Sequence, residues 1–113
     1  MLPLLKALAD DSRLRILWML EGRELCVCEI QAVLGLAQST VSRHLQVLED
    51  AGFVVSSREG LWKNYRLHPS PTPVAQSLLA TLRLTAAGDD EAAALRRKAV
   101  EVCRQDLCGR RVA

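Results

Sequence analysis

Apolar positions in the first half of the chain recur at helical spacing, in segments that glycines separate. The segment DDSRLRILWML places the capping candidates Asp11 and Ser12 before a dense apolar run, which ends at Gly22. A shorter helical pattern, CVCEIQAVLG, follows and stops at Gly35. These two patterns predict consecutive helices in a largely α-helical domain.

The next segment, QSTVSRHLQVLEDAG, has one apolar stripe and one polar face. Val41, Leu45 and Leu48 fall at i, i+4 and i+7, so they are expected to be buried together. The opposite side begins with short or hydrogen-bonding side chains. Two short helices joined by a tight turn, the second with such a face, are typical of a helix-turn-helix, which we predict over about residues 27–51.

Two β-prone runs then flank the tripeptide REG in FVVSSREGLWKNYRL, where Gly60 can adopt the positive φ of a turn. This pattern predicts a hairpin over about residues 53–67. A helix-turn-helix followed by a hairpin is a winged helix. The predicted fold class is therefore mainly α with a small β-hairpin (α+β), a winged helix-turn-helix.

A Pro-rich connector, HPSPTP, precedes two further helical patterns over about residues 74–106. The first of them combines little charge with four apolar residues: Val74, Leu78, Leu79 and Leu82. That is more apolar surface than a lone peripheral helix normally carries, so we expect it to pack against a second copy of the chain. The chain is predicted to be one winged-helix domain over residues 1–113, homodimeric through N- and C-terminal dimerisation helices.

Composition fits this picture without deciding the function. The chain has 113 residues, of which half are hydrophobic, and a formal net charge of +2, which permits nucleic-acid binding without requiring it. No segment approaches the roughly 20 apolar residues of a membrane span, and the start MLPLLKALADD lacks the long apolar core of a signal peptide. We therefore expect a cytoplasmic protein with no membrane partner, whose four cysteines serve ligation or redox sensing rather than a disulfide framework.

The polar face of the predicted second helix suits duplex DNA. Short side chains at its front let the backbone approach the major groove, where Gln, Ser, Thr and Arg can bond base edges or phosphates. On the wing, Arg58, Lys63 and Arg66 could reach the DNA backbone or the minor groove. The predicted DNA-binding residues are Gln38, Ser39, Thr40, Ser42, Arg43, His44, Arg58 and Lys63.

Two alternatives stay open at this stage. His44 lies at the edge of the apolar stripe, so it either contacts DNA or closes the core. The whole face could also be a solvated surface of a winged helix that binds protein, since a fold does not fix a function. Among the candidates, Arg43 is the strongest because it can bond a base or a phosphate.

The cysteines form two pairs, Cys26 with Cys28 and Cys103 with Cys108. Residues two apart on an ideal helix point to nearly opposite sides, so binding one ion with the first pair is expected to distort the helix start. Thiolates are the preferred ligands of soft ions. All four cysteines are candidate metal ligands, the alternative being that they are small buried hydrophobic side chains.

The order of LADDSRLRIL, ELCVCEI, QSTVSRHLQVLEDAGFV and REGLWKNYRL resembles the ArsR/SmtB family of bacterial winged-helix repressors, specifically its arsenic-responsive branch, over about residues 4–67. The resemblance implies a homodimeric repressor that binds double-stranded operator DNA, expected to be an inverted repeat. It also implies release of the DNA when a metal or metalloid binds. The expected inducer is As(III) or Sb(III), with no permanent cofactor.

The sequence departs from the arsenic-responsive pattern where a third cysteine would follow, because Gln31 stands there. As(III) and Sb(III) favour three thiolates in a pyramid. Cys103 or Cys108 could complete the site from the same or the partner subunit, or the two pairs could bind separate ions. A thiol-based redox sensor remains an alternative, as does a sensor of Cd(II), Pb(II) or Zn(II), for which four sulfurs can form a tetrahedron.

An enzyme is not expected. The chain has no phosphate-binding glycine loop and no nucleophile elbow, and its C-x-C spacing differs from the C-x-x-C of disulfide oxidoreductases.

Overall fold

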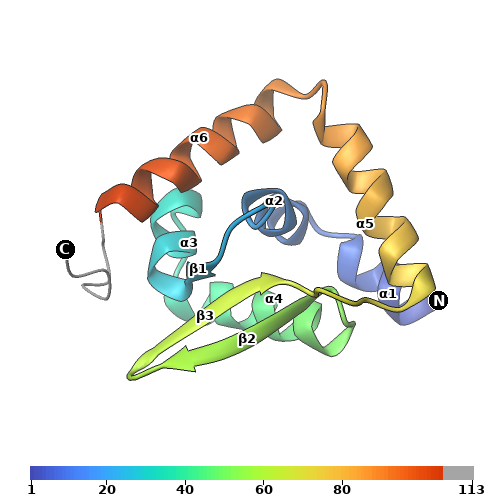
Figure 1. Cartoon of the computed structure of the whole chain (residues 1–113), viewed down its shortest axis with the longest axis horizontal. Coiled ribbons are helices and arrows are strands. Elements are labelled where there is room, and N and C mark those ends of the chain that lie inside the picture. The colour runs from blue at the N-terminus through green and yellow to red at the C-terminus, as the bar shows by residue number, and fades with distance from the viewer. Residues whose placement is uncertain (106–113) are drawn as a thin grey trace.

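The computed structural model describes residues 1–105, with side chains up to residue 102, and confirms the winged helix-turn-helix (Figure 1). The elements follow in the order α1 (Leu2–Leu8), α2 (Asp11–Met19), β1 (Leu25–Cys26), α3 (Val27–Leu34), α4 (Gln38–Asp50), β2 (Val54–Glu59), β3 (Trp62–Leu67), α5 (Pro73–Ala86) and α6 (Asp90–Gln105).

Helix α4 buries the stripe that its sequence predicted. Val41, Leu45 and Leu48 are all 0% exposed and belong to one core cluster with side chains of α2, α3 and the wing, among them Phe53. Gly35 ends α3 in the left-handed region, with φ of 71°, where a side chain would be strained. Because Val41, Leu45 and Leu48 are buried, the core holds the apolar side of α4 and the polar side of this helix faces outward.

The sheet has three strands rather than the two of the predicted hairpin. Its strand order is β1-β3-β2, and β1 pairs antiparallel with β3 so that Leu25 lies opposite Tyr65 and Cys26 opposite Asn64. The expectation that Cys26 lies inside a helix was wrong, because this cysteine ends β1 and α3 begins one residue later. A two-residue strand has no periodicity of its own, and a partner about forty residues along the chain defines it.

The two C-terminal helices have different environments. Helix α6 folds back across α2 and α3 (Figure 1) and buries four apolar residues within its own chain: Ala92, Leu95, Ala99 and Val102. Leu78, Leu79 and Leu82 of α5 are half-buried against the core, which leaves Val74 and Leu84 as its exposed large apolar side chains. The apolar surface that remains for a second copy on α5 is thus smaller than its sequence indicated.

The N-cap of α2 is Asp10, one residue before the expected caps, Asp11 and Ser12. The Asp10 carboxylate accepts a hydrogen bond from the backbone N–H of Arg13 at 3.1 Å. Burial opposes ionisation of Asp10, but this bond and the nearby positive charges outweigh it, so the pKa of Asp10 lies below its ordinary value. The charged form of the Asp10 carboxyl group is therefore the one that stabilises the start of α2.

Replacing Asp10 by alanine is expected to lower the free energy of unfolding by about 1 kcal/mol at neutral pH, because the N-cap bond is lost. A carboxylate whose pKa is lowered in the folded state contributes its full share of the free energy of unfolding above its ordinary pKa of 3.8. This stabilisation disappears as the pH falls through the folded-state pKa. Urea unfolding at neutral and acid pH should therefore give a difference that shrinks in acid. Asp10→Asn is the control, since asparagine caps without titrating; equal stability of all three proteins at neutral pH would contradict the assignment.

Candidate functional site

The outward side of α4 presents the residues predicted to read DNA. Gln38, Ser39 and Arg43 are exposed, and Thr40 and Ser42 are half-buried at the front of the helix. The helix starts directly at Gln38, so its first backbone N–H groups and these short side chains lie at the same end. This end can approach a polyanion closely, and its chemistry suits hydrogen bonding to bases or phosphates.

His44 is less exposed than Gln38, Ser39 and Arg43, and its ring contacts Arg13 of α2. Its Nδ1 lies 3.2 Å from Nη1 of Arg13, whose other nitrogens donate to the carbonyl oxygens of Lys6 and Ala7 at 3.1 and 2.6 Å. A guanidinium only donates, so this Nδ1 accepts and the ring proton is assigned to Nε2. The half-buried His44 thus ties α4 to α2 and to the end of α1, and keeps one N–H as a donor.

The three wing cations have different surroundings. Arg58 and Arg66 are exposed on β2 and β3. Lys63, opposite Arg58 in the strand register, is half-buried, with its Nζ 5.5 Å from the centre of the Tyr65 ring. The strand register places Arg58 and Arg66 on opposite faces of the hairpin, and each is more accessible to a phosphate than Lys63.

Cys26 and Cys28 lie in the bend where β1 becomes α3. Cys26 is 2% exposed and Cys28 half-buried, and neither forms a disulfide. Cys26 occupies the N-cap of α3 with extended backbone. The backbone N–H of Cys26 donates to the Glu29 carboxylate at 2.9 Å, and the Cys26 side chain faces the backbone N–H of Glu29, as in a capping box. Because the first thiol precedes the helix, the ideal-helix argument that separates the two sulfurs does not apply.

The two thiols line a pocket of about 180 Å³ at the meeting point of α3, α4 and the wing. Its lining residues are Cys26, Val27, Cys28, Gln38, Leu61, Trp62 and Lys63. Two of the predicted DNA-binding residues, Gln38 and Lys63, thus border the same space as the predicted metal ligands. A ligand bound by these thiols would touch the front of α4 and the tip of the hairpin.

The second cysteine pair cannot be placed in the same way. Cys103 belongs to the last turn of α6, but its side chain, like the whole of Cys108, lies outside the described residues. In the part of the chain that the structure describes, no three His, Cys, Asp or Glu side chains gather into a metal site. The described pocket therefore supplies two thiols.

Sequence reasoning missed three residues of this site. Glu29 is 1% exposed and follows Cys26 by three positions, which is the capping-box spacing with cysteine in place of the usual serine or threonine. Leu61 and Trp62 follow the turn at Gly60 and form an apolar pair at the tip of the wing. Local sequence patterns gave no reason to connect this pair with the cysteines at the start of α3.

No helix among the described residues is long and apolar enough to cross a membrane.

Comparison with known proteins gives consistent matches. Residues 10–56 match the family described as "Bacterial regulatory protein, arsR family". Arsenic resistance transcriptional regulator ArsR1 of Pseudomonas putida is 50% identical over 66 residues, which are 57% of this chain and 51% of the relative. The arsenical resistance operon repressor of Escherichia coli is 42% identical over 69 residues, 60% of this chain and 59% of the relative. The chain thus spans between half and three-fifths of these two proteins.

The fold has solved counterparts. The homodimeric winged helix-turn-helix DNA-binding domain of Mb0332 from Mycobacterium bovis, described as a possible ArsR-family transcriptional regulator, is 36% identical. It superposes with a TM-score of 0.63 over 74% of this chain and 75% of that domain. Both the relatives and the fold are those of DNA-binding transcriptional regulators.

Proposed function

The chain belongs to the ArsR family of bacterial regulatory proteins, and from this premise we propose that it is a dimeric repressor whose operator DNA is released when a trivalent metalloid binds Cys26 and Cys28. The observation that carries the proposal is the shared pocket. Cys26 and Cys28 border it together with Gln38, the first residue of α4, and Trp62 and Lys63 of the wing. Ligand and DNA would therefore act on the same residues.

The capping of α3 offers a route from binding to release. The Cys26 side chain faces the N–H groups at the start of α3, and its backbone N–H is held by buried Glu29. A sulfur that bonds a metalloid must orient toward the pocket, so the capping arrangement would be lost or distorted. Because α3 packs on α4 and the pocket wall includes Gln38, a shift there would change the presentation of α4.

The proposed third ligand comes from the end of the chain. Helix α6 packs against α3 (Figure 1), so Cys103 belongs to an element that already lies beside the helix bearing Cys28. We propose that Cys103 or Cys108 supplies the third thiolate that arsenite or antimonite favours. Substitution of each by serine, followed by measurement of arsenite affinity, tests this and identifies the cysteine.

Dimerisation is proposed to use α1 and α5. Both helices expose large apolar side chains, with Leu2 60%, Leu5 44% and Leu84 78% exposed. The homodimeric state of the Mb0332 domain supports a dimer of this fold. Two copies would present two α4 helices, which matches an inverted-repeat operator with half-sites roughly 34 Å apart. Residues 1–113 are accordingly proposed to form one DNA-binding domain, with α6 completing the core of each subunit.

The function is tested by selecting duplexes that the purified protein retains from a randomised pool and titrating the selected complex with arsenite. We expect enrichment of an inverted repeat, and loss of fluorescence anisotropy of the labelled duplex as arsenite is added. Release by Cd(II) but not by arsenite would identify a sensor of another soft ion. Release by peroxide alone, reversed by dithiothreitol, would identify the redox alternative. If the protein retains no duplex from the pool, the proposal of a repressor is contradicted.

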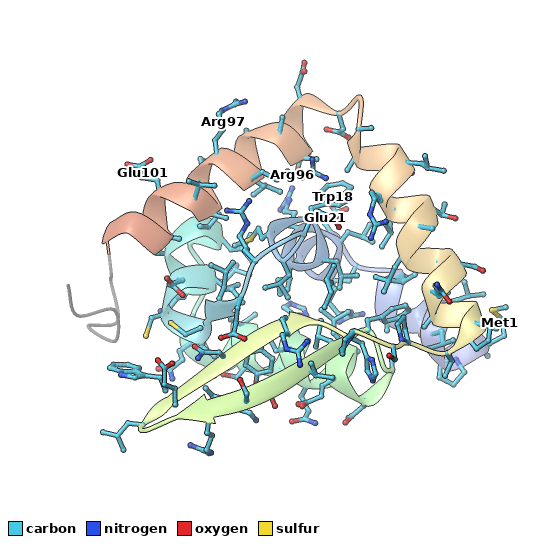
Figure 2. The ribbon with its side chains drawn as sticks, viewed as in Figure 1. Met1, Trp18, Glu21, Arg96, Arg97 and Glu101 are labelled. Atoms are coloured by element: carbon cyan, nitrogen blue, oxygen red, sulfur yellow. The ribbon has the colours of Figure 1, made fainter. Side chains whose placement is uncertain are left out.

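Replacing Arg43 by alanine is expected to weaken operator binding by about 1–3 kcal/mol if its guanidinium contacts a base, and to lower the salt dependence by about one ion if it contacts a phosphate. Arg97→Ala is the matched control, because it removes the same charge from α6, where Figure 2 shows the side chain pointing away from the rest of the molecule. Anisotropy titrations at several salt concentrations measure both quantities. Equal affinities of the two variants would remove Arg43 from the interface.

A further inference from the structure

The ring of His44 on α4 is held by a hydrogen-bond network that begins in α1. Arg13, near the start of α2, donates from Nε to the carbonyl oxygen of Ala7 at 2.6 Å and from Nη2 to that of Lys6 at 3.1 Å. Its Nη1 lies 3.2 Å from Nδ1 of His44, which follows it by 31 positions in the chain. One guanidinium thus joins the last turn of α1 to the helix that presents the predicted DNA-binding residues.

The guanidinium of Arg13 is itself held in one orientation. Each of its three nitrogens has an acceptor in this network, and a guanidinium is a rigid, planar fork of donors. The Asp10 carboxylate, which accepts a hydrogen bond from the backbone N–H of Arg13 at 3.1 Å, supplies a negative charge beside this half-buried cation. Arg13 is therefore a fixed donor for the ring of His44.

The network also determines which nitrogen of His44 can act on DNA. Nδ1 accepts from Arg13, so the neutral ring carries its proton on Nε2. No hydrogen bond between described residues uses Nε2, and this nitrogen is not one of the buried polar atoms that lack a partner in the described part of the chain. His44 follows Thr40 by one helical turn, so both lie on the same side of α4. The ring therefore offers one N–H donor, in one orientation, beside the polar front of the helix.

We infer that Arg13 is a positioning residue for DNA recognition, which holds His44 in the Nε2–H tautomer so that this N–H donates to a phosphate oxygen of the operator. The inference rests on the proposed repressor, in which α4 binds DNA, and gives a part to a residue that does not itself touch the DNA. A phosphate suits a half-buried donor at the edge of the polar face, because phosphates border the groove that a recognition helix enters, and contacts to them fix the register of the protein.

The same network relates His44 to the proposed subunit interface. Helix α1 exposes Leu2 and Leu5, and the carbonyl groups that hold Arg13 lie in its last turn. Two hydrogen-bonded steps, from Ala7 to Arg13 and from Arg13 to His44, therefore connect the interface helix to the ring. In a dimer this connection would hold the two His44 rings at a constant separation, as two half-sites of fixed spacing require.

A double-mutant cycle distinguishes positioning from a purely structural role. Arg13→Ala and His44→Ala should each weaken binding of the selected operator duplex by roughly tenfold, and the double variant should lose about tenfold rather than about a hundredfold, because Arg13 acts through His44. Anisotropy titrations of the full chain measure the four affinities. Arg15→Ala is the matched control, because it removes the same charge from α2 and breaks a 2.7 Å ion pair with Glu91 of α6, and it should leave operator affinity unchanged.

His44→Asn keeps the inference testable if the loss of Arg13 destabilises the fold. The amide oxygen of asparagine can take the place of Nδ1 and accept from Arg13, but no donor replaces Nε2. This variant should therefore unfold at nearly the wild-type urea concentration and bind the operator as weakly as His44→Ala does.

The tautomer is measured directly by ¹⁵N NMR of the histidine ring in mildly alkaline buffer without DNA, where a histidine is uncharged. The wild type should show a protonated Nε2 and an unprotonated Nδ1 at His44. Arg13→Ala should show nitrogen shifts averaged between the two tautomers, because Nδ1 has lost its donor.

The outcomes separate the inference from the proposed function. Additive losses in the cycle, wild-type operator affinity of His44→Asn, or an unchanged single tautomer in Arg13→Ala would each overturn the role of Arg13 while the repressor stands. A wild-type protein that retains no duplex contradicts the repressor and the role of Arg13 with it. Non-additive losses together with averaged tautomers in Arg13→Ala support the inference.

Discussion

A Cys26→Ser/Cys28→Ser protein is expected to bind its operator as tightly as the wild type and to stay bound as arsenite is added. The arsenite concentration for half-release should rise by roughly two orders of magnitude or more, because each bond between a soft ion and a thiolate supplies several kcal/mol and two are removed. Operator affinity should be retained, since neither side chain belongs to the exposed face of α4. Anisotropy titrations of the selected duplex measure both quantities.

The structure provides an internal control for this experiment. Cys26 occupies the N-cap of α3, and serine is one of the residues that stabilise a helix most at this position. Cys26→Ser should therefore keep or raise the free energy of unfolding. Loss of response together with unchanged or increased stability would then assign the effect to the missing thiols. Release of the double variant at the wild-type arsenite concentration would refute the sensor, whatever its stability.

A Leu5→Glu/Leu84→Glu protein is expected to be monomeric at concentrations where the wild type is a dimer. These side chains are 44% and 78% exposed on α1 and α5, so charge there opposes association while the core of the subunit is left in place. A monomer loses the second, effectively intramolecular half-site contact, which lowers apparent operator affinity by roughly 10²- to 10⁴-fold. Sedimentation equilibrium without DNA, followed by operator titration, measures the two steps separately.

Leu61→Glu is the matched control for the association step, because Leu61, on the wing, is the most exposed of the large apolar side chains that the structure describes. It should sediment as the wild type does. A dimeric Leu5→Glu/Leu84→Glu protein would place the subunit interface elsewhere, and a monomer that still binds the full operator with wild-type affinity would contradict bivalent recognition.

The local pattern of the sequence predicted those parts of the protein whose structure depends on near neighbours. The stripe of Val41, Leu45 and Leu48 predicted α4 and its outward polar face, since burying one side of an amphipathic helix exposes the other. Glycines with positive φ at 35 and 60 predicted the end of α3 and the turn of the wing. The family resemblance came from the same segments, and it is shown by the comparisons.

Contacts between distant segments decided the rest. Strand β1 exists because Leu25 and Cys26 pair with β3, and this pairing moves Cys26 out of the helix that its neighbours indicated. The link from Arg13 to His44 spans 31 positions, so no local pattern could show that His44 joins α4 to α2.

The sequence by itself therefore determined the winged helix, the outward polar face of α4 and the presence of a thiol pair, because each depends on spacing along a few turns of chain. Only the tertiary structure placed Leu61 and Trp62 beside Cys26 and Cys28, and folded α6 over α3. Packing between elements set these neighbours, and they are what connect a pair of cysteines to the surface proposed to hold DNA.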